Sequence, residues 1–123
     1  MGLGNVNVTQ GLATFRSIDL DESEEAVKAS PGSVFAIYAS NAHATDARWL
    51  KLYDGTAASV VVGTTTPVAT FFLPANGANP MKFETPHGMA FSTAITAAAT
   101  TAAADADTGA PAANDVVVVI LYR

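Results

Sequence analysis

Six consecutive large aliphatic residues, 116–121, lie within the last ten positions of the sequence, 114–123. Side chains alternate between the two faces of a strand. The run therefore divides into Val116, Val118, Ile120 and Tyr122 on one face and Val117, Val119 and Leu121 on the other. Both faces are apolar, whereas a strand with one solvated face alternates with polar residues, so this strand needs cover on both sides. We expect it to be a central strand, or one covered by a neighbouring subunit.

The energetic weight of this run is large. At about 1.5–3 kcal/mol per buried aliphatic side chain, it contributes on the order of 10 kcal/mol. The net stability of a whole domain is about 5–15 kcal/mol. The strand must therefore be buried in the folded protein, and other segments have to pack against it.

The charge content is low for a chain of 123 residues, a length that suits one domain with its own core. Charged residues make up 14% of the sequence, against about 25% in a typical soluble domain. Ala and Thr take the place of the usual surface Lys and Glu. Since monomer surfaces normally carry more charge, we expect partners to cover part of this one.

Charge and composition also disfavour several classes of function. The net charge is −5 and the six Lys and Arg residues are scattered, whereas nucleic-acid binding needs clustered cations. No apolar run approaches the ~18 residues of a membrane span, and the N-terminus lacks the regions of a signal peptide. There is no cysteine, which removes disulfides and thiolate nucleophiles. We expect no nucleic-acid or membrane partner.

Turn residues divide the chain into short extended segments. We expect residues 1–10 to form an arm and residues 11–123 to form one β-sandwich domain. The expected strands are 13–20 (an edge strand), 25–29, 33–39, 47–53, 68–73, 81–84, 89–99 and 116–122, with 57–62 as a short strand or extended segment and 75–80 as a loop. About eight short strands at regular spacing indicate an all-β, single-domain sandwich of jelly-roll type with antiparallel strands.

The Ala-rich segment 93–106 is ambiguous, because Ala favours helix. Thr recurs in it, and it has neither helix caps nor a large apolar stripe to pack. We therefore expect a strand to Ala99, followed by a loop through Ala113. A helix is the alternative.

Candidate chemistry is sparse. Five acids lie within residues 19–25, which suggests a solvated turn; a divalent-cation site is the alternative, although the spacing matches no EF-hand. His43 and His87 lie in expected loops, and no motif marks a nucleophile, a metal site or a cofactor site. We expect a protein that is not an enzyme and has no cofactor, metal or catalytic residue.

The aromatic residues are the strongest interface candidates. In segment 47–53, Leu50 and Leu52 share one face, which we expect in the core, and Trp49, Lys51 and Tyr53 share the outer or subunit-facing side. Aromatic residues favour interface cores because they bring large, rigid area. The expected interface residues are Trp49, Tyr53, Phe35, Phe72, Val117, Val119 and Leu121. In the alternative, Trp49 and Tyr53 stack on a glycan in a groove with Asn76 and Asn79.

Several blocks of sequence together resemble small structural proteins of tailed bacteriophages and prophages. The blocks are Val-Lys-Ala-Ser-Pro-Gly-Ser-Val-Phe (27–35), Trp-Leu-Lys-Leu-Tyr-Asp (49–54), Val-Gly-Thr-Thr-Thr-Pro-Val (62–68), Phe-Leu-Pro-Ala (72–75), Gly-Met-Ala-Phe-Ser-Thr (88–93) and the terminal run 114–122. The resemblance covers about residues 26–123. It implies a β-sandwich capsid decoration (cement) protein, or a related head, neck or tail component.

This resemblance sets the functional expectations. A decoration protein is located on the capsid surface of the virion after synthesis in the bacterial cytoplasm. Its partners are the major capsid protein and other copies of itself, as a homodimer or homotrimer. The alternative is a tail, neck or fibre module that recognises a host surface or glycan, and a third class is a cellular carbohydrate-binding accessory.

Overall fold

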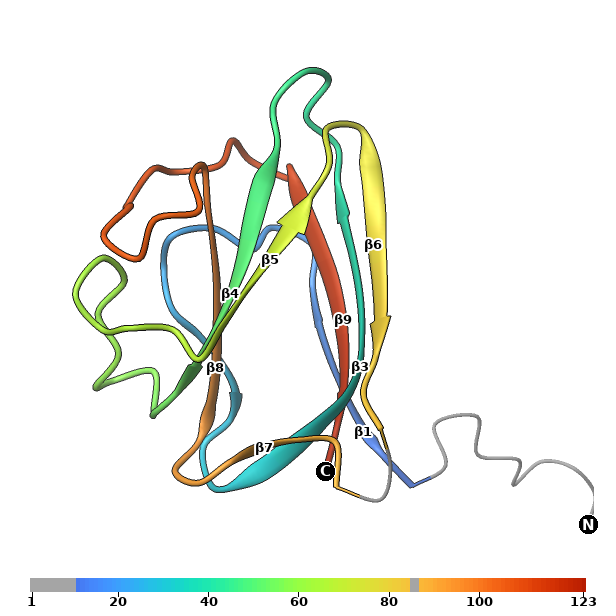
Figure 1. The fold of residues 1–123 in the computed structure, drawn as a ribbon, viewed down its shortest axis with the longest axis vertical. Helices are drawn as coiled ribbons and strands as arrows, with labels where there is room; N and C mark the ends of the chain where they lie inside the picture. Colours follow the sequence, from blue (N-terminus) through green and yellow to red (C-terminus); the bar gives the residue numbers. More distant parts are fainter. Residues whose placement is uncertain (1–10, 85–86) are drawn as a thin grey trace, which may run out of the picture.

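The computed structural model describes residues 11–84 and 87–123, so the arm expected at residues 1–10 lies outside the described part. Nine antiparallel strands form two packed sheets, and the described residues contain no helix (Figure 1). The strands are β1 (Ala13–Ser17), β2 (Glu25–Lys28), β3 (Gly32–Asn41), β4 (Arg48–Asp54), β5 (Ala69–Leu73), β6 (Gly77–Lys82), β7 (Met89–Phe91), β8 (Ile95–Thr100) and β9 (Val116–Tyr122). The predicted all-β sandwich is confirmed.

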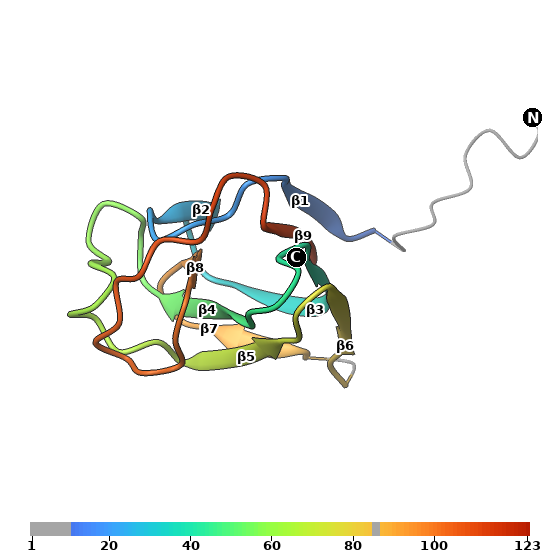
Figure 2. The ribbon, with the colours of Figure 1, turned by 90° about the horizontal axis from the view of Figure 1, so that it is seen from above.

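The strands pair in a nested pattern. β1 pairs with β9, β2 with β8, β3 with β6 and β7, and β4 with β5. A long antiparallel hairpin rolled over on itself has this pattern, which is that of a jelly roll. Sheet A has the order β1-β9-β3-β6, with β7 also on β3, and sheet B has the order β2-β8-β4-β5. Seen from above, the two sheets form two layers (Figure 2).

The terminal strand β9 lies in the middle of sheet A, between β1 and β3, as the apolar run predicts. Its residue Ile120 pairs with Phe15 of β1 and Ile37 of β3. The residues of this parity that have no exposed surface are Val116, Val118 and Ile120. The residues of the opposite parity, Val117, Val119 and Leu121, are only partly buried. The sandwich therefore covers one of the two apolar faces.

Sheet B supplies the other half of the core. Leu50 and Leu52 of β4 are fully buried, which confirms their predicted place in the core. They pair with Ala99 and Ala97 of β8. The rest of this core cluster consists of Leu20, Val27, Val34, Ile37, Ala39, Leu73, Phe91, Ile95, Val116, Val118 and Ile120.

The segment expected as one strand at residues 89–99 is two strands in different sheets. β7 pairs with β3 in sheet A, and β8 pairs with β2 and β4 in sheet B. All six residues of β8 are buried. Cover on both faces stabilises an extended Ala/Thr segment that propensity alone would place in a helix. The helix alternative is therefore wrong.

Two further expectations are wrong. Residues 57–62 form no strand, because two local turns, in which Val60 N–H donates to Thr56 O and Thr65 N–H to Val61 O, satisfy the backbone instead. The loop expected at 75–80 is largely β6, since pairing with β3 outweighs the local composition. Pro80 is tolerated there because β6 is an edge strand of sheet A.

A buried ion pair joins the two sheets near one end of the sandwich. The Arg48 Nε and one terminal guanidinium nitrogen of Arg48 each lie 3.0 Å from Asp115 Oδ2. The same oxygen accepts a hydrogen bond from the Ala112 backbone N–H at 3.0 Å. This pair links the start of β4 in sheet B to the residue that precedes β9 in sheet A.

Candidate protein-interaction surface

The two outer faces of the sandwich are covered to very different extents. Two loops of the same chain, residues 55–67 and 101–113, lie over the outer face of sheet B (Figures 1 and 2). Val60 and Val62 of the first loop form a small second core with Tyr53 and Ala98. Gly63 has a φ of 90°, and a side chain there would clash with Thr108 of the second loop. The two loops thus pack against one another and close this face.

Tyr53 has no exposed surface, so the expectation that it lies at a subunit interface is wrong. A period of two shows which face a side chain takes, but not that loops distant in sequence fold over that face. Burial raises the pKa of Tyr53, and the carboxylates of Glu24 and Asp105 raise it further. No described residue makes a hydrogen bond with its hydroxyl group.

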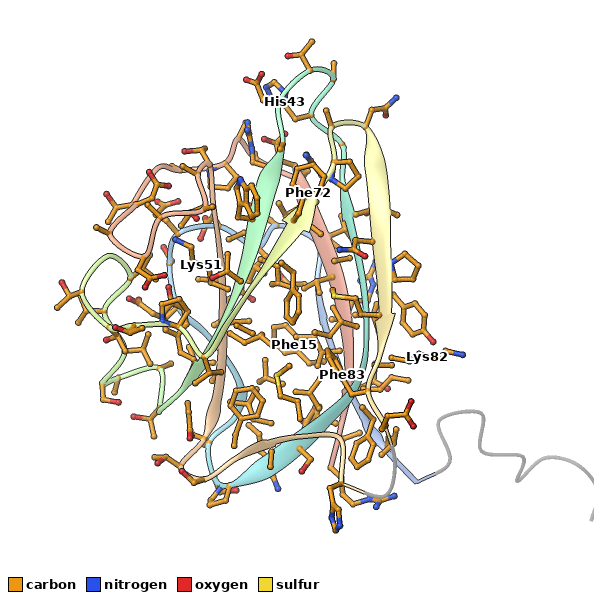
Figure 3. All side chains as sticks on the ribbon, viewed as in Figure 1. Phe15, His43, Lys51, Phe72, Lys82 and Phe83 are labelled. Carbon is orange, nitrogen blue, oxygen red and sulfur yellow. The ribbon has the colours of Figure 1, made fainter. Side chains whose placement is uncertain are left out.

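Lys51 is buried beneath the same loops, on the outer side of sheet B (Figure 3). Its Nζ donates a hydrogen bond to the backbone oxygen of Ala104 at 2.6 Å. Burial lowers the pKa of Lys51, while Asp107 and Asp105 oppose the shift because they favour the charged form. The lysine therefore fastens the second loop to the sheet and is not part of the exposed surface.

Trp49 and Phe72 remain as an aromatic pair near the β5 edge of sheet B. Their ring centroids are 5.1 Å apart and the rings are inclined by 60°. Phe72 is 47% exposed. The Asn79 side-chain amide donates to Phe72 O at 2.9 Å, so this residue ties β6 to β5. Asn76 is exposed, in the turn just before β6.

The outer face of sheet A presents residues from four strands in three rows. The register places Thr14, Leu121, Ala36 and Lys82 in the first row, Arg16, Val119, Tyr38 and Pro80 in the second, and Val117, Ser40 and Ala78 in the third. We refer to these eleven residues as the outer face of sheet A. No described segment lies over this face (Figure 2).

The centre of the outer face of sheet A is apolar and slightly hollow. Tyr38 is 43% exposed, which is high for an aromatic side chain in the middle strand of a sheet. A shallow depression of about 220 Å³ lies beside it and is also lined by Pro80, Ala78 and Val117. Ile18, just beyond β1, is 48% exposed. Exposed apolar surface of this kind is typical of an interaction site.

Positive charge borders this face. Arg16 lies on the β1 edge and Lys82 on the β6 edge, where Figure 3 shows Lys82 pointing away from the sandwich. Arg123 follows β9, with its guanidinium 5.3 Å from the centre of the Phe35 ring. These are the three exposed cationic side chains of the chain, since Arg48 and Lys51 are buried and Lys28 is half-buried. None of the eleven outer-face positions carries a carboxylate.

The expected interface residues thus separate into three groups. Val117, Val119 and Leu121 lie together on the outer face of sheet A, and the partly buried Phe35 lies at its end, where the β3 register shifts. Trp49 and Phe72 lie on sheet B, and Tyr53 is buried. No single surface contains all seven residues.

Most of the acids in residues 19–25 hold the chain's own loops. Asp19 Oδ1 accepts a hydrogen bond from the Asn114 backbone N–H at 2.8 Å, and Asp21 Oδ1 accepts one from Ser23 N–H at 2.9 Å. Glu24 Oε1 accepts one from Val62 N–H at 3.0 Å, and Glu25 Oε2 accepts one from the Ser17 hydroxyl at 3.1 Å. Because these carboxylates point to four different places, they do not converge on a common ligand.

Asp54 has a structural role at the crossing between the sheets. Its Oδ1 accepts hydrogen bonds from the backbone N–H groups of Thr93 and Ala94, and its Oδ2 accepts from the N–H and hydroxyl of Ser92. Partial burial alone would raise the pKa of Asp54, but these hydrogen bonds outweigh burial and lower it. The charged carboxylate therefore stabilises the turn that carries the chain from β7 to β8.

Neither histidine lies in a cluster of acidic side chains among the described residues. His43 Nδ1 accepts hydrogen bonds from the N–H groups of Thr45 and Asp46, and its Nε2 is 3.9 Å from Asp46 Oδ2. His87 is exposed. Within residues 11–84 and 87–123, no group of three or more His, Asp and Glu side chains is placed to hold a metal ion.

Sequence reasoning missed Tyr38, Arg16 and Lys82 as surface residues of interest. Tyr38 shares its parity with Val34 and Ala36, and nothing in the sequence shows which parity of β3 faces out. Their common position becomes visible only from the strand register, which aligns Tyr38 with Val119 and places Arg16 and Lys82 at opposite edges of the same face.

Comparison with protein families, with characterised proteins and with solved structures gave no significant match. In the described part of the chain, no helix has the length and apolar character to span a membrane.

Proposed function

We propose that this protein is a non-enzymatic structural component of a bacteriophage virion, and that it decorates and stabilises the head shell. The observation that carries the proposal is the outer face of sheet A. It is the apolar face of the strand with the greatest need for cover, and within the described residues it is uncovered. The resemblance of several sequence blocks to small phage structural proteins supports the same role.

The mechanism would be stabilisation by mass action. A protein that binds the assembled shell, but not its separated subunits, shifts the equilibrium toward the shell. Such a protein needs a stable scaffold and a docking face. The nested sheets and the loops fastened by Lys51 and Asp54 provide the scaffold, and the outer face of sheet A provides the docking face. The partner is the major capsid protein, and a homodimer or homotrimer remains a prediction.

Imaging and copy counting on purified particles test this proposal. An antibody against the recombinant protein should label the head over its whole surface, and the copy number per particle should match a repeating site on the shell. Heads that lack the protein should lose their contents at a lower temperature, and added protein should restore the original temperature. A few copies confined to the tail would refute the proposal.

Glycan recognition by a tail or fibre module is the second candidate, and the Trp49–Phe72 pair favours it. Phe72 is 47% exposed beside Trp49, and exposed aromatic rings stack on sugars. The 60° inclination of the two rings makes a poor flat platform, and the buried Tyr53 cannot extend it. A glycan panel that raises the melting temperature of the wild type, but not of Trp49→Ala, would establish this function.

A further inference from the structure

We infer that the outer face of sheet A docks on an apolar protein surface whose border carries carboxylates at two opposite sides. This inference rests on the proposed function, in which the surface belongs to the assembled head shell. It goes further because it specifies the chemistry of the partner and names two residues, Arg16 and Lys82, that form ion pairs with the partner's carboxylates.

Charge complementarity is the first reason. The chain has eleven acidic and six basic side chains, yet all three exposed basic side chains lie on or beside one face. Arg16 and Lys82 occupy the two outermost strands of sheet A, three strand spacings apart. With strands about 4.8 Å apart, and the two residues one row apart, their Cα atoms are separated by roughly 16 Å. A partner would therefore present carboxylates on both sides of an apolar centre.

The centre of the face identifies the partner as a protein. Val119, Tyr38 and Pro80 fill the space between the two cations. A nucleic acid would need a cluster of cations along a groove, and two separated cations around an apolar centre do not provide one. Apolar centres with polar borders are typical of protein–protein interfaces.

Area and charge both disfavour a second copy as the occupant. Four strands with about six residues each present roughly 20 Å by 20 Å. Two such faces in contact bury about 800 Å², which is below the ~1,200 Å² of a stable interface. Two copies in face-to-face contact would also bring cationic edges together, since both edges carry a cation. An assembled shell can add further contacts around the same face, which two isolated copies cannot.

Two acidic residues lie beyond the two ends of the face and define its limits. Asp19 follows β1, and its carboxylate is occupied by the Asn114 backbone N–H. Glu84 is exposed two residues beyond Lys82. Neither lies in one of the three rows, so the apolar centre meets the partner without a carboxylate of its own chain.

Charge reversal tests the inference. The probe is purified heads from a phage strain in which this gene is deleted, and the variants are Arg16→Glu, Lys82→Glu and their combination. Both side chains are exposed, so we expect these variants to fold with the melting temperature of the wild type. The combined variant should bind heads roughly tenfold or more weakly at physiological salt, because each reversal turns an attraction into a repulsion.

Lys28→Glu is the matched control. It changes the net charge by the same amount as either single variant, but Lys28 lies on β2 at the edge of sheet B, where its Nζ donates to Pro31 O at 2.8 Å. Its affinity for heads should stay within about twofold of the wild type. Binding of the wild type should weaken as salt rises, and the combined variant should lose most of this dependence.

Three results would overturn the inference, and they separate it from the proposed function. If wild type and combined variant bind heads equally, at every salt concentration, the shell contacts another face and only the inference fails. If the wild type self-associates at micromolar concentration and the combined variant does not, the occupant is a second copy. If the wild type does not bind heads at all, the proposed function fails and the inference fails with it.

Discussion

Adjacent residues of β9 should respond very differently to truncation, because the strand has one face in the core and one outside it. Ile120 has no exposed surface and lies between Phe15 and Ile37. Ile120→Ala removes three buried carbon groups, which costs about 2.4 kcal/mol in transfer free energy. The cavity left behind adds more, for a total of about 3–4 kcal/mol.

Leu121→Ala is the matched control, since it removes the same number of carbon groups from the next residue. Leu121 is partly exposed on the outer face of sheet A. Its truncation leaves no closed cavity, so the cost should be about 1 kcal/mol or less. The expected stability of a chain of this length is about 6–18 kcal/mol, so both variants should still fold.

Urea denaturation and thermal unfolding, both followed by circular dichroism, measure the two costs. Ile120→Ala should lower the melting temperature by about 10–15 °C and Leu121→Ala by less than about 5 °C. The slope of the free energy with urea should stay unchanged in both, because the same surface is exposed on unfolding. Equal costs at the two positions, or a larger cost at Leu121, would show that the outer face is not at the surface of the folded chain.

Three further perturbations test the scaffold. Asp54→Asn should cost on the order of 1–2 kcal/mol, and it should flatten the acid limb of the stability curve. Because the pKa of Asp54 is lowered in the folded state, its contribution to stability is complete above pH 3.8, the ordinary pKa of an aspartate, and is lost as the pH falls through the folded-state pKa. If Asp54→Asn leaves the loss of stability at acid pH unchanged, Asp54 does not have this role. Tyr53→Phe should be neutral or stabilise by up to about 1 kcal/mol, because the hydroxyl is buried without a described partner. Since burial raises the pKa of Tyr53, the tyrosine ionises first in the unfolded state, and the stability of the wild type should fall above pH ~10. This fall should be weaker in Tyr53→Phe. If Tyr53→Phe lowers the stability by more than about 1 kcal/mol at neutral pH, the hydroxyl makes a hydrogen bond. Deletion of residues 119–123 should prevent soluble folding, and a soluble product with the wild-type melting temperature would refute the central place of β9.

The alternation of side chains was enough to predict the class of fold and the place of β9. The two apolar faces of residues 116–122 predicted a central strand, or one covered by a neighbouring subunit, and β9 is central in sheet A, between β1 and β3. Leu50 and Leu52 were assigned to the core for the same reason. In each case the pattern repeats every two residues and depends only on the strand itself.

Features that depend on contacts between distant segments were not predictable. Pro80 belongs to β6 because β3 supplies the pairing, although the local composition is that of a loop. The segment 89–99 bends between two sheets because Asp54, from another strand, binds the backbone of the turn. Tyr53 is buried because Val60 and Val62 fold over it. Each of these contacts joins residues that the sequence alone does not place together.

The residues of the interface prediction are divided among different surfaces for the same reason, and the interface itself remains a prediction. Apolar character singled out Val117, Val119 and Leu121, and the structure places all three on the outer face of sheet A. The sequence did not show that loops of the same chain cover the outer face of sheet B, whereas no described segment covers that of sheet A. The charged border of Arg16 and Lys82 appears only when β1 and β6 take their places at the two edges.

Site-directed labelling on the head tests the central claim most directly. The chain has no cysteine, so Tyr38→Cys introduces a single reactive thiol in the centre of the outer face of sheet A. Ala58→Cys is the control, in the exposed loop over sheet B. The rate of thiol labelling is measured for the free protein and for the protein bound to heads that lack the native copy. Binding should strongly slow the labelling of Tyr38→Cys and leave that of Ala58→Cys unchanged, whereas protection at position 58 alone, or at neither position, would contradict the claim that the outer face of sheet A meets the shell.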